Sequence, residues 1–176
     1  MLPRFCRCLN SVRNFLNMKL SYRLSEIAKH ISYCANVADI GTDHGHLPVY
    51  LAQMNPNRHI IASDISEKSL KAAYKSASKY SVTESIEFVV APGLEGISRS
   101  DVDTIVISGL GGETIVSILT DMPWTKSENI KLILQPQSKI AVLCRFLYDN
   151  FYTIKKAISV RDRDKTYNIL VICKDR

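Results

Sequence analysis

The sequence predicts an α/β protein with a doubly wound, mostly parallel seven-stranded sheet that ends in an antiparallel hairpin. Short runs rich in Val, Ile and Ala alternate with helix-like segments between residues 36 and 149, which is typical of βαβ units with right-handed crossovers. These runs are apolar on both faces, as strands buried inside a parallel sheet are. Beyond residue 150 two strand-like runs follow each other directly, which predicts the hairpin.

The expected elements can be placed in order. A helix begins after Met18, with Ser21 as its N-cap and a stripe of apolar residues at helical spacing. Strands are expected at 36–40, 59–64, 85–90, 103–108 and 130–135. Between them lie helices at 46–54, 66–79, 112–120 and 138–149, the second of which Ser66 can cap. The closing hairpin pairs 151–160 with 166–173.

Composition narrows the class of protein. The 176 residues are enough for one domain with its own core, which we assign to 18–176. Hydrophobic residues make up 46% and charged residues 23%, and no apolar run approaches the ~20 residues of a membrane span. We therefore expect a cytoplasmic protein with no membrane partner, in which a monomer is favoured although the oligomeric state is open. The five irregularly spaced cysteines fit reduced thiols, and no motif demands a metal.

Residues 1–17 differ from the rest of the chain. They carry three arginines and no acidic residue, whereas the remaining charges nearly balance within a net charge of +6. Three interpretations stay open: a natural extension or a start codon chosen too far upstream, an organelle presequence, or a basic arm that touches RNA. We expect this segment to be disordered or not native to the folded domain.

A glycine loop after the first strand carries the clearest functional signal. It runs Asp39-Ile40-Gly41-Thr42-Asp43-His44-Gly45, and glycines let the backbone come close to a ligand. Asp64 ends the next strand 23 residues after Gly41, close to the ~20 of a ribose-binding acid. The alternative is an Asp that caps the following helix, and both roles can coexist. The loop lacks the dinucleotide pattern G-x-G-x-x-G and is closer to the S-adenosylmethionine loop of class I methyltransferases, which favours methyl transfer over hydride transfer.

Four segments together resemble a known family. They are Leu20–Leu24, the loop Ala38–His44, the run Asp101–Gly112 that ends in Gly-Leu-Gly-Gly, and Leu132–Gln137. In this order they are similar to the bacterial TrmK family of S-adenosylmethionine-dependent tRNA (adenine(22)-N(1))-methyltransferases. The similarity runs from about Met18 to the C-terminus. It implies the class I methyltransferase fold, S-adenosylmethionine as cofactor and tRNA as partner. No metal is expected, because the sequence has no H-x-x-x-H or paired-carboxylate pattern that demands one.

The resemblance places the cofactor along the loop and the strand ends. Asp39 is positioned to meet the ammonium group, Gly41 and Gly45 to let the backbone approach the methionine moiety, and Asp64 to accept from the ribose. Pro92 stands where the family usually has an Asp that accepts from the adenine amine, and proline has neither a side-chain acceptor nor a backbone N–H. Backbone at Ala91 or Gly93 can substitute. The complete expected cofactor set is Asp39, Gly41, Thr42, Asp43, Gly45, Asp64, Ile65, Ala91, Pro92, Gly93 and Ser108.

The methyl acceptor is expected beside the fourth and fifth strands. Gly109 and Gly111 open space for a flat base, although a helix entry with Gly111 and Gly112 at its first turn also needs glycine. Asp43 can stabilise positive charge on the methylated ring. We assign Gly109, Gly111 and Asp43 to the transfer itself. The segment lacks the Asn/Asp-Pro-Pro-aromatic motif of amino-group DNA methyltransferases, which argues against N6 methylation. Expected substrate contacts are Arg23, His44, Gln135, Gln137 and Arg145, of which the arginines are equally well explained as solvated helix charges and His44 as a structural residue.

The predicted function is therefore methyl transfer to N1 of adenine 22 in tRNA. Adenine N1 carries its own lone pair, so positioning for in-line displacement matters more than a strong general base. The family continues past its last strand into a helical arm that helps to hold tRNA, whereas this sequence ends at Arg176. A protein without the arm is expected to bind tRNA weakly, to use a partner or to have another substrate. Alternatives are a methyltransferase of small molecules or proteins, and a non-catalytic S-adenosylmethionine-binding module.

Overall fold

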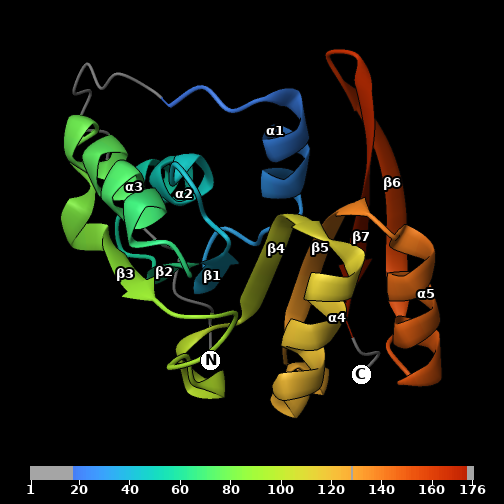
Figure 1. Cartoon of the computed structure of the whole chain (residues 1–176). Helices are drawn as coiled ribbons and strands as arrows, with labels where there is room; N and C mark the ends of the chain where they lie inside the picture. The colour runs from blue at the N-terminus through green and yellow to red at the C-terminus, as the bar shows by residue number, and fades with distance from the viewer. Residues whose placement is uncertain (1–17, 128, 174–176) are drawn as a thin grey trace, which may run out of the picture.

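A single seven-stranded sheet organises the chain. The computed structural model describes residues 18–127 and 129–173, so the predictions for residues 1–17 lie outside its range. The strand order is β3-β2-β1-β4-β5-β7-β6, with β7 antiparallel to both β5 and β6 and every other pair parallel. Figure 1 shows the sheet running from β3 on one side to the β6–β7 hairpin on the other. The predicted fold class is confirmed. The strands are β1 Val37–Ile40, β2 Ile60–Asp64, β3 Ile86–Val90, β4 Thr104–Gly111, β5 Lys131–Ser138, β6 Ile154–Asp162 and β7 Lys165–Ile172.

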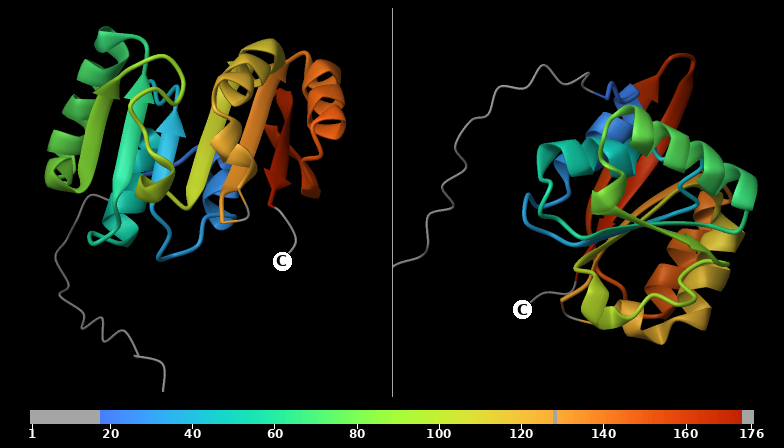
Figure 2. Two further views of the ribbon diagram at one scale, coloured as in Figure 1. Left: turned by 90° about the horizontal axis from the view of Figure 1, so that it is seen from below. Right: turned by 90° about the vertical axis from the view of Figure 1, so that its left-hand side faces the viewer.

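Helices cover both faces of the sheet. Those before β3 pack on one face, whereas those after β4 pack on the other, as the right-hand view of Figure 2 shows. Three short 3₁₀ turns complete the connections in the part of the chain that the structure describes. No helix within the described ranges has both the length and the apolar character to cross a membrane. The helices are α1 Tyr22–Lys29, α2 His46–Met54, α3 Glu67–Lys79, α4 Gly112–Asp121 and α5 Ile140–Asp149.

Helix starts follow the sequence signals closely. Ser21 caps α1 by accepting from the Leu24 amide at 3.3 Å, and Ser66 caps α3 by accepting from the Ser69 amide at 3.3 Å. Both caps were predicted, because a hydroxyl before a helix satisfies an amide that has no intrahelical partner. The first five strands and β7 begin within one residue of their predicted starts, whereas β6 begins at Ile154, three residues later than predicted. β4 and β5 run three residues further than predicted, to Gly111 and Ser138.

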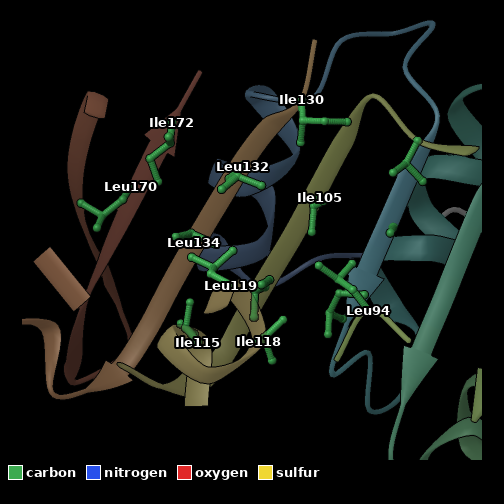
Figure 3. Packing of buried hydrophobic residues seen from close by; sticks show 14 of the residues in the cluster. Leu94, Ile105, Ile115, Ile118, Leu119, Ile130, Leu132, Leu134, Leu170 and Ile172 are labelled. Atoms are coloured by element: carbon green, nitrogen blue, oxygen red, sulfur yellow. The ribbon is translucent and has the colours of Figure 1, made fainter. Parts of the chain in front are cut away.

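Aliphatic side chains fill the space between the sheet and α4 and α5. Ile105, Leu132 and Leu134 from the strands meet Ile115 and Leu119 from α4, and all five are essentially inaccessible to solvent. Figure 3 shows these side chains interleaved between the two layers. Burial of one such side chain is worth about 1.5–3 kcal/mol, so this packing fixes the sheet edge on which the loops stand.

Candidate functional site

Two neighbouring cavities open at the edge of the sheet where the parallel strands end. The first is about 320 Å³ and lies between the ends of β1, β2 and β3 and helix α4. The second is about 170 Å³ and lies between the β1–α2 loop, the end of β4 and α1. Gly41 lines both cavities. Open α/β sheets bind ligands at this edge, where the strand order reverses. Here that point lies between β1 and β4.

The loop between β1 and α2 is wound tightly by left-handed backbone. Gly41, Asp43 and Gly45 all have positive φ, of 72°, 50° and 67°, and such angles are common only for Gly, Asn and Asp. The amides of Gly41 and Thr42 both donate to the Ser63 carbonyl, at 2.8 and 3.1 Å, which ties the loop to the end of β2. The loop therefore forms a fixed partition between the two cavities.

Asp39 is a buried carboxylate at the end of β1. Only 5% of the residue is exposed, and its Oδ2 accepts from the Thr42 hydroxyl at 2.7 Å. Burial raises the pKa of Asp39 to about 7, although the Thr42 hydrogen bond and the nearby Arg23 charge work in the opposite direction. A carboxyl poised near neutrality can bind a cation by ionising. Asp39 also lines the second cavity, where the sequence predicts the ammonium group of a cofactor.

The raised pKa predicts a pH dependence of ligand binding. Below a pH of about 7 the free protein must give up the Asp39 proton before this carboxylate can pair with an ammonium group. We therefore expect affinity for S-adenosylhomocysteine to rise about tenfold between about pH 6 and pH 8, with proton release at about pH 6. Calorimetry in buffers of different ionisation enthalpy measures both quantities.

The Asp39→Asn variant is the control for this prediction, because its profile should be flat. The raised pKa of Asp39 also determines how the stability of the folded protein changes with pH. The folded pKa exceeds the ordinary value of 3.8, so the free wild-type protein loses stability as pH rises from about 4 to 7. A wild-type affinity that does not change over this neutral range contradicts the assignment.

Asp64 stands at the end of β2 on the rim of the first cavity. Its two oxygens accept from the backbone amides of Asp43, at 3.2 Å, and of Ser66, at 2.8 Å. It thus supports the loop and the start of α3, as the capping interpretation predicts. It also lines the cavity, and each carboxylate oxygen has a second lone pair for a ligand.

The first cavity is predominantly apolar. Ile65 stands on its wall with 75% of its surface exposed, so its side chain is accessible to a ligand. Ala91, Pro92 and Gly93, which the resemblance assigns to the cofactor, line it as well.

Polar residues that the sequence did not single out also line the first cavity. They are Glu95, Thr114, Ser117 and Asp121. The last three recur along α4 at a spacing that puts them on one face of the helix. The carboxylates of Glu95 and Asp121 therefore supply acceptors that Pro92 lacks.

The second cavity is more polar and is organised around Arg23. The Arg23 guanidinium donates to Gln135 Oε1, which belongs to a fully buried side chain, and lies 5.3 Å from the centre of the Tyr167 ring. The Arg23 backbone amide donates to Asp162 on the hairpin at 3.0 Å. Contacts with β5, β6 and β7 thus fix a cation on the cavity wall. Ser108, Gly109, Gln137, Asp43 and His44 also line it.

Some predicted site residues lie elsewhere. Gln135 holds Arg23 and does not line the cavity, so it acts as a positioning residue. Arg145 lies on α5, where it pairs with Asp149 at 2.7 Å. Gly111 ends β4 outside both cavities, and Gly45 packs against α3, with Ala73 2.8 Å from the position that a Cβ would take.

The fold and the cavities together define a class I methyltransferase domain. A family model described as a methyltransferase domain matches residues 20–170. The structure of the m1A22 tRNA methyltransferase TrmK of Bacillus subtilis has 31% sequence identity and a TM-score of 0.83, with 90% of this chain and 68% of that chain covered. TrmK of M. capricolum, solved with S-adenosylhomocysteine, has 32% identity and a TM-score of 0.78 over 89% and 70% of the two chains. The chain belongs to the TrmK family.

The chain is shorter than its curated relatives. It is 31% identical over 154 residues to the tRNA (adenine(22)-N(1))-methyltransferase of Bacillus subtilis, which covers 88% of this chain and 65% of the relative. The chain therefore spans just under two thirds of the length of that relative. More distant structures share the fold alone, such as a ribosomal protein L11 methylase of Lactobacillus delbrueckii with 19% identity and a TM-score of 0.72.

Proposed function

We propose that this chain transfers a methyl group from S-adenosylmethionine to N1 of adenine 22 in tRNA. The observation that carries the proposal is the pair of cavities that meet at Gly41, one apolar with a carboxylate on its rim and one polar with a fixed arginine. Membership of the TrmK family supports the choice of acceptor. Under this proposal the protein binds tRNA and acts in the cytoplasm.

The residues of the first cavity fit an adenosyl group. Ile65 and Leu110 offer apolar surfaces to a flat base, and Asp64 offers free lone pairs to ribose hydroxyls. The methionine part would pass Gly41 toward Asp39, whose carboxylate can pair with the ammonium group. Cavities on the two sides of one glycine therefore suit the two ends of S-adenosylmethionine.

S-adenosylmethionine supplies a methyl group bound to a positively charged sulfur. The lone pair of adenine N1 forms the new N–CH3 bond while the S–CH3 bonding pair stays on sulfur, so the positive charge passes to the adenine ring and no proton moves. The chain's residues need only hold the base in line and stabilise the displaced charge. We assign the second task to Asp43, because its side chain lines the second cavity and is 70% exposed.

The acceptor cavity offers polar groups for a base edge. Gln137 has both a donor and an acceptor on its amide, and its Nε2 lies 3.3 Å from the position that a Cβ on Gly109 would take. A side chain at residue 109 would therefore crowd Gln137, which explains why space is kept there. The target adenine has to leave its stack to enter, as bases do in other enzymes that modify them.

The first experiment is methyl transfer from labelled S-adenosylmethionine to unmodified tRNA, with the modified nucleoside identified by mass spectrometry. We expect N1-methyladenosine, and we expect it to vanish when nucleotide 22 is guanine, because guanine N1 carries a proton and presents no lone pair. The affinity for S-adenosylhomocysteine is measured by calorimetry on the same sample.

Three results separate the proposal from its alternatives. Methylation that persists with guanine at nucleotide 22 would refute the position. Cofactor binding without transfer to any tRNA would point to a different acceptor or to a non-catalytic module. Absence of cofactor binding would remove the basis of the proposal altogether.

A further inference from the structure

A third cavity, which the proposed reaction does not use, lies beside the acceptor site. It is about 350 Å³ and is lined by the end of β5, the start of α5 and the start of β7. The cavity arises from the way in which strands β5 and β7 pair. The β5–β7 ladder stops at Leu134 and Leu170, after which β5 stays with β4 as far as Ser138 and β7 stays with β6 as far as Lys165. The two strands therefore separate, and the cavity occupies the gap.

Two lysines stand on opposite walls of this gap. Lys139 joins β5 to α5, and Lys165 begins β7. Lys139 holds a left-handed backbone with φ of 55°, and its carbonyl oxygen packs so closely on Gly112 that a Cβ there would collide with it. The corner that carries Lys139 is thus pinned against the start of α4. Lys165 is fixed by its register opposite Asp162 in the hairpin.

Neither charge has an acidic partner among residues 18–127 and 129–173. Ion pairs there engage other lysines but not these two. Asp162, which lies opposite Lys165 in the hairpin, accepts instead from the Arg23 amide. The remaining lining includes hydroxyl and amide groups from Ser138, Thr166 and Asn168. Two ammonium groups over a lining of neutral donors suit an anion of the size of phosphate.

The third cavity adjoins the acceptor cavity. Gln137 lines both cavities. Tyr167, which lines the third cavity, lies under the Arg23 guanidinium that lines the acceptor cavity. A nucleotide whose base enters the acceptor cavity would therefore have its backbone near Lys139 and Lys165.

We propose that this third cavity binds a backbone phosphate of the substrate RNA, adjacent to the nucleotide that is methylated. The inference rests on the proposed function, since it needs a nucleic-acid substrate. Lys139 and Lys165 would then contribute to the affinity for RNA and to its register in the site, whatever the base. Phosphate contacts position a protein on a nucleic acid, whereas base contacts specify the sequence.

The test compares the K139Q/K165Q variant with a K75Q/K156Q control that removes the same charge. Lys75 lies on α3, and Lys156 lies near the opposite end of β6. Binding of unmodified tRNA is measured over a range of salt concentrations, and thermal unfolding and S-adenosylhomocysteine binding are measured as checks on folding. We expect K139Q/K165Q to weaken tRNA binding about tenfold and to reduce the salt slope by about 1 to 2, with the cofactor affinity unchanged.

Each outcome decides the inference. A K139Q/K165Q variant that binds tRNA with the wild-type affinity and salt slope, or that matches the control, overturns the phosphate site and leaves the proposed methylation intact. A wild-type protein that neither binds nor methylates tRNA overturns both proposals. If K139Q/K165Q alone loses tRNA affinity and the wild type methylates tRNA, the result supports both the phosphate site and the proposed methylation.

Discussion

Replacing Asp64 by asparagine is expected to weaken binding of S-adenosylhomocysteine about 100-fold, or about 2.7 kcal/mol. In the proposed complex the carboxylate accepts charge-assisted hydrogen bonds from ribose hydroxyls, each worth about 1.5–3 kcal/mol. An asparagine keeps one acceptor oxygen and loses the charge. Isothermal titration calorimetry measures the effect directly, and kcat/KM for methyl transfer should fall in parallel.

The asparagine also faces two backbone amides. Asp64 accepts from both Asp43 and Ser66, so the NH2 group of the substituted side chain would oppose one N–H donor with another and cost about 1–3 kcal/mol of stability. Binding and stability are separated by a control at the opposite end of the parallel strands. Asp103 accepts from the Asn36 amide at 2.9 Å, and Asp103→Asn should lower stability without changing cofactor affinity. Equal loss of affinity in both variants would show that Asp64 acts only as a cap.

The arrangement of the sheet was predictable because its signals are local. Strand segments such as residues 105–107 of β4 are apolar on both faces and follow a polar turn, so their positions can be predicted from the local pattern of residues. The caps at Ser21 and Ser66 were predictable for the same reason. The cavity walls that carry Asp39, Asp64 and Pro92 then follow, because parallel strands end at one edge of the sheet.

The parts of the site that escaped prediction depend on contacts between distant segments. Gln135 was expected to touch substrate, but it is buried beneath Arg23, 112 residues away along the chain. The third cavity exists only because the β5–β7 ladder ends early at Leu134, and sequence patterns do not reveal register. Arg145 is a different case, because its partner is local: Asp149, four residues further along α5, engages its guanidinium.

Gly45 was expected to serve the cofactor, and its packing against α3 also predicts a large effect on stability when it is substituted. Its φ of 67° strains any residue with a Cβ, and that Cβ would lie 2.8 Å from Ala73 Cβ and 3.0 Å from Ala73 Cα. Left-handed strain costs about 1–2 kcal/mol and overpacking about 1–3 kcal/mol. We therefore expect Gly45→Ala to destabilise the protein by about 2–5 kcal/mol and to lower Tm by about 10 °C.

Gly96 is the matched control for this substitution. Its φ is 75°, yet nothing lies within 4 Å of the position that its Cβ would take, so Gly96→Ala carries the backbone strain without the clash. We expect it to cost only about 1–2 kcal/mol, and the difference in chemical denaturation between the two variants measures the contact between the loop and α3. Equal destabilisation would mean that α3 moves away at no cost. A larger loss in Gly45→Ala would show that close approach to Ala73, rather than contact with a ligand, requires glycine at residue 45.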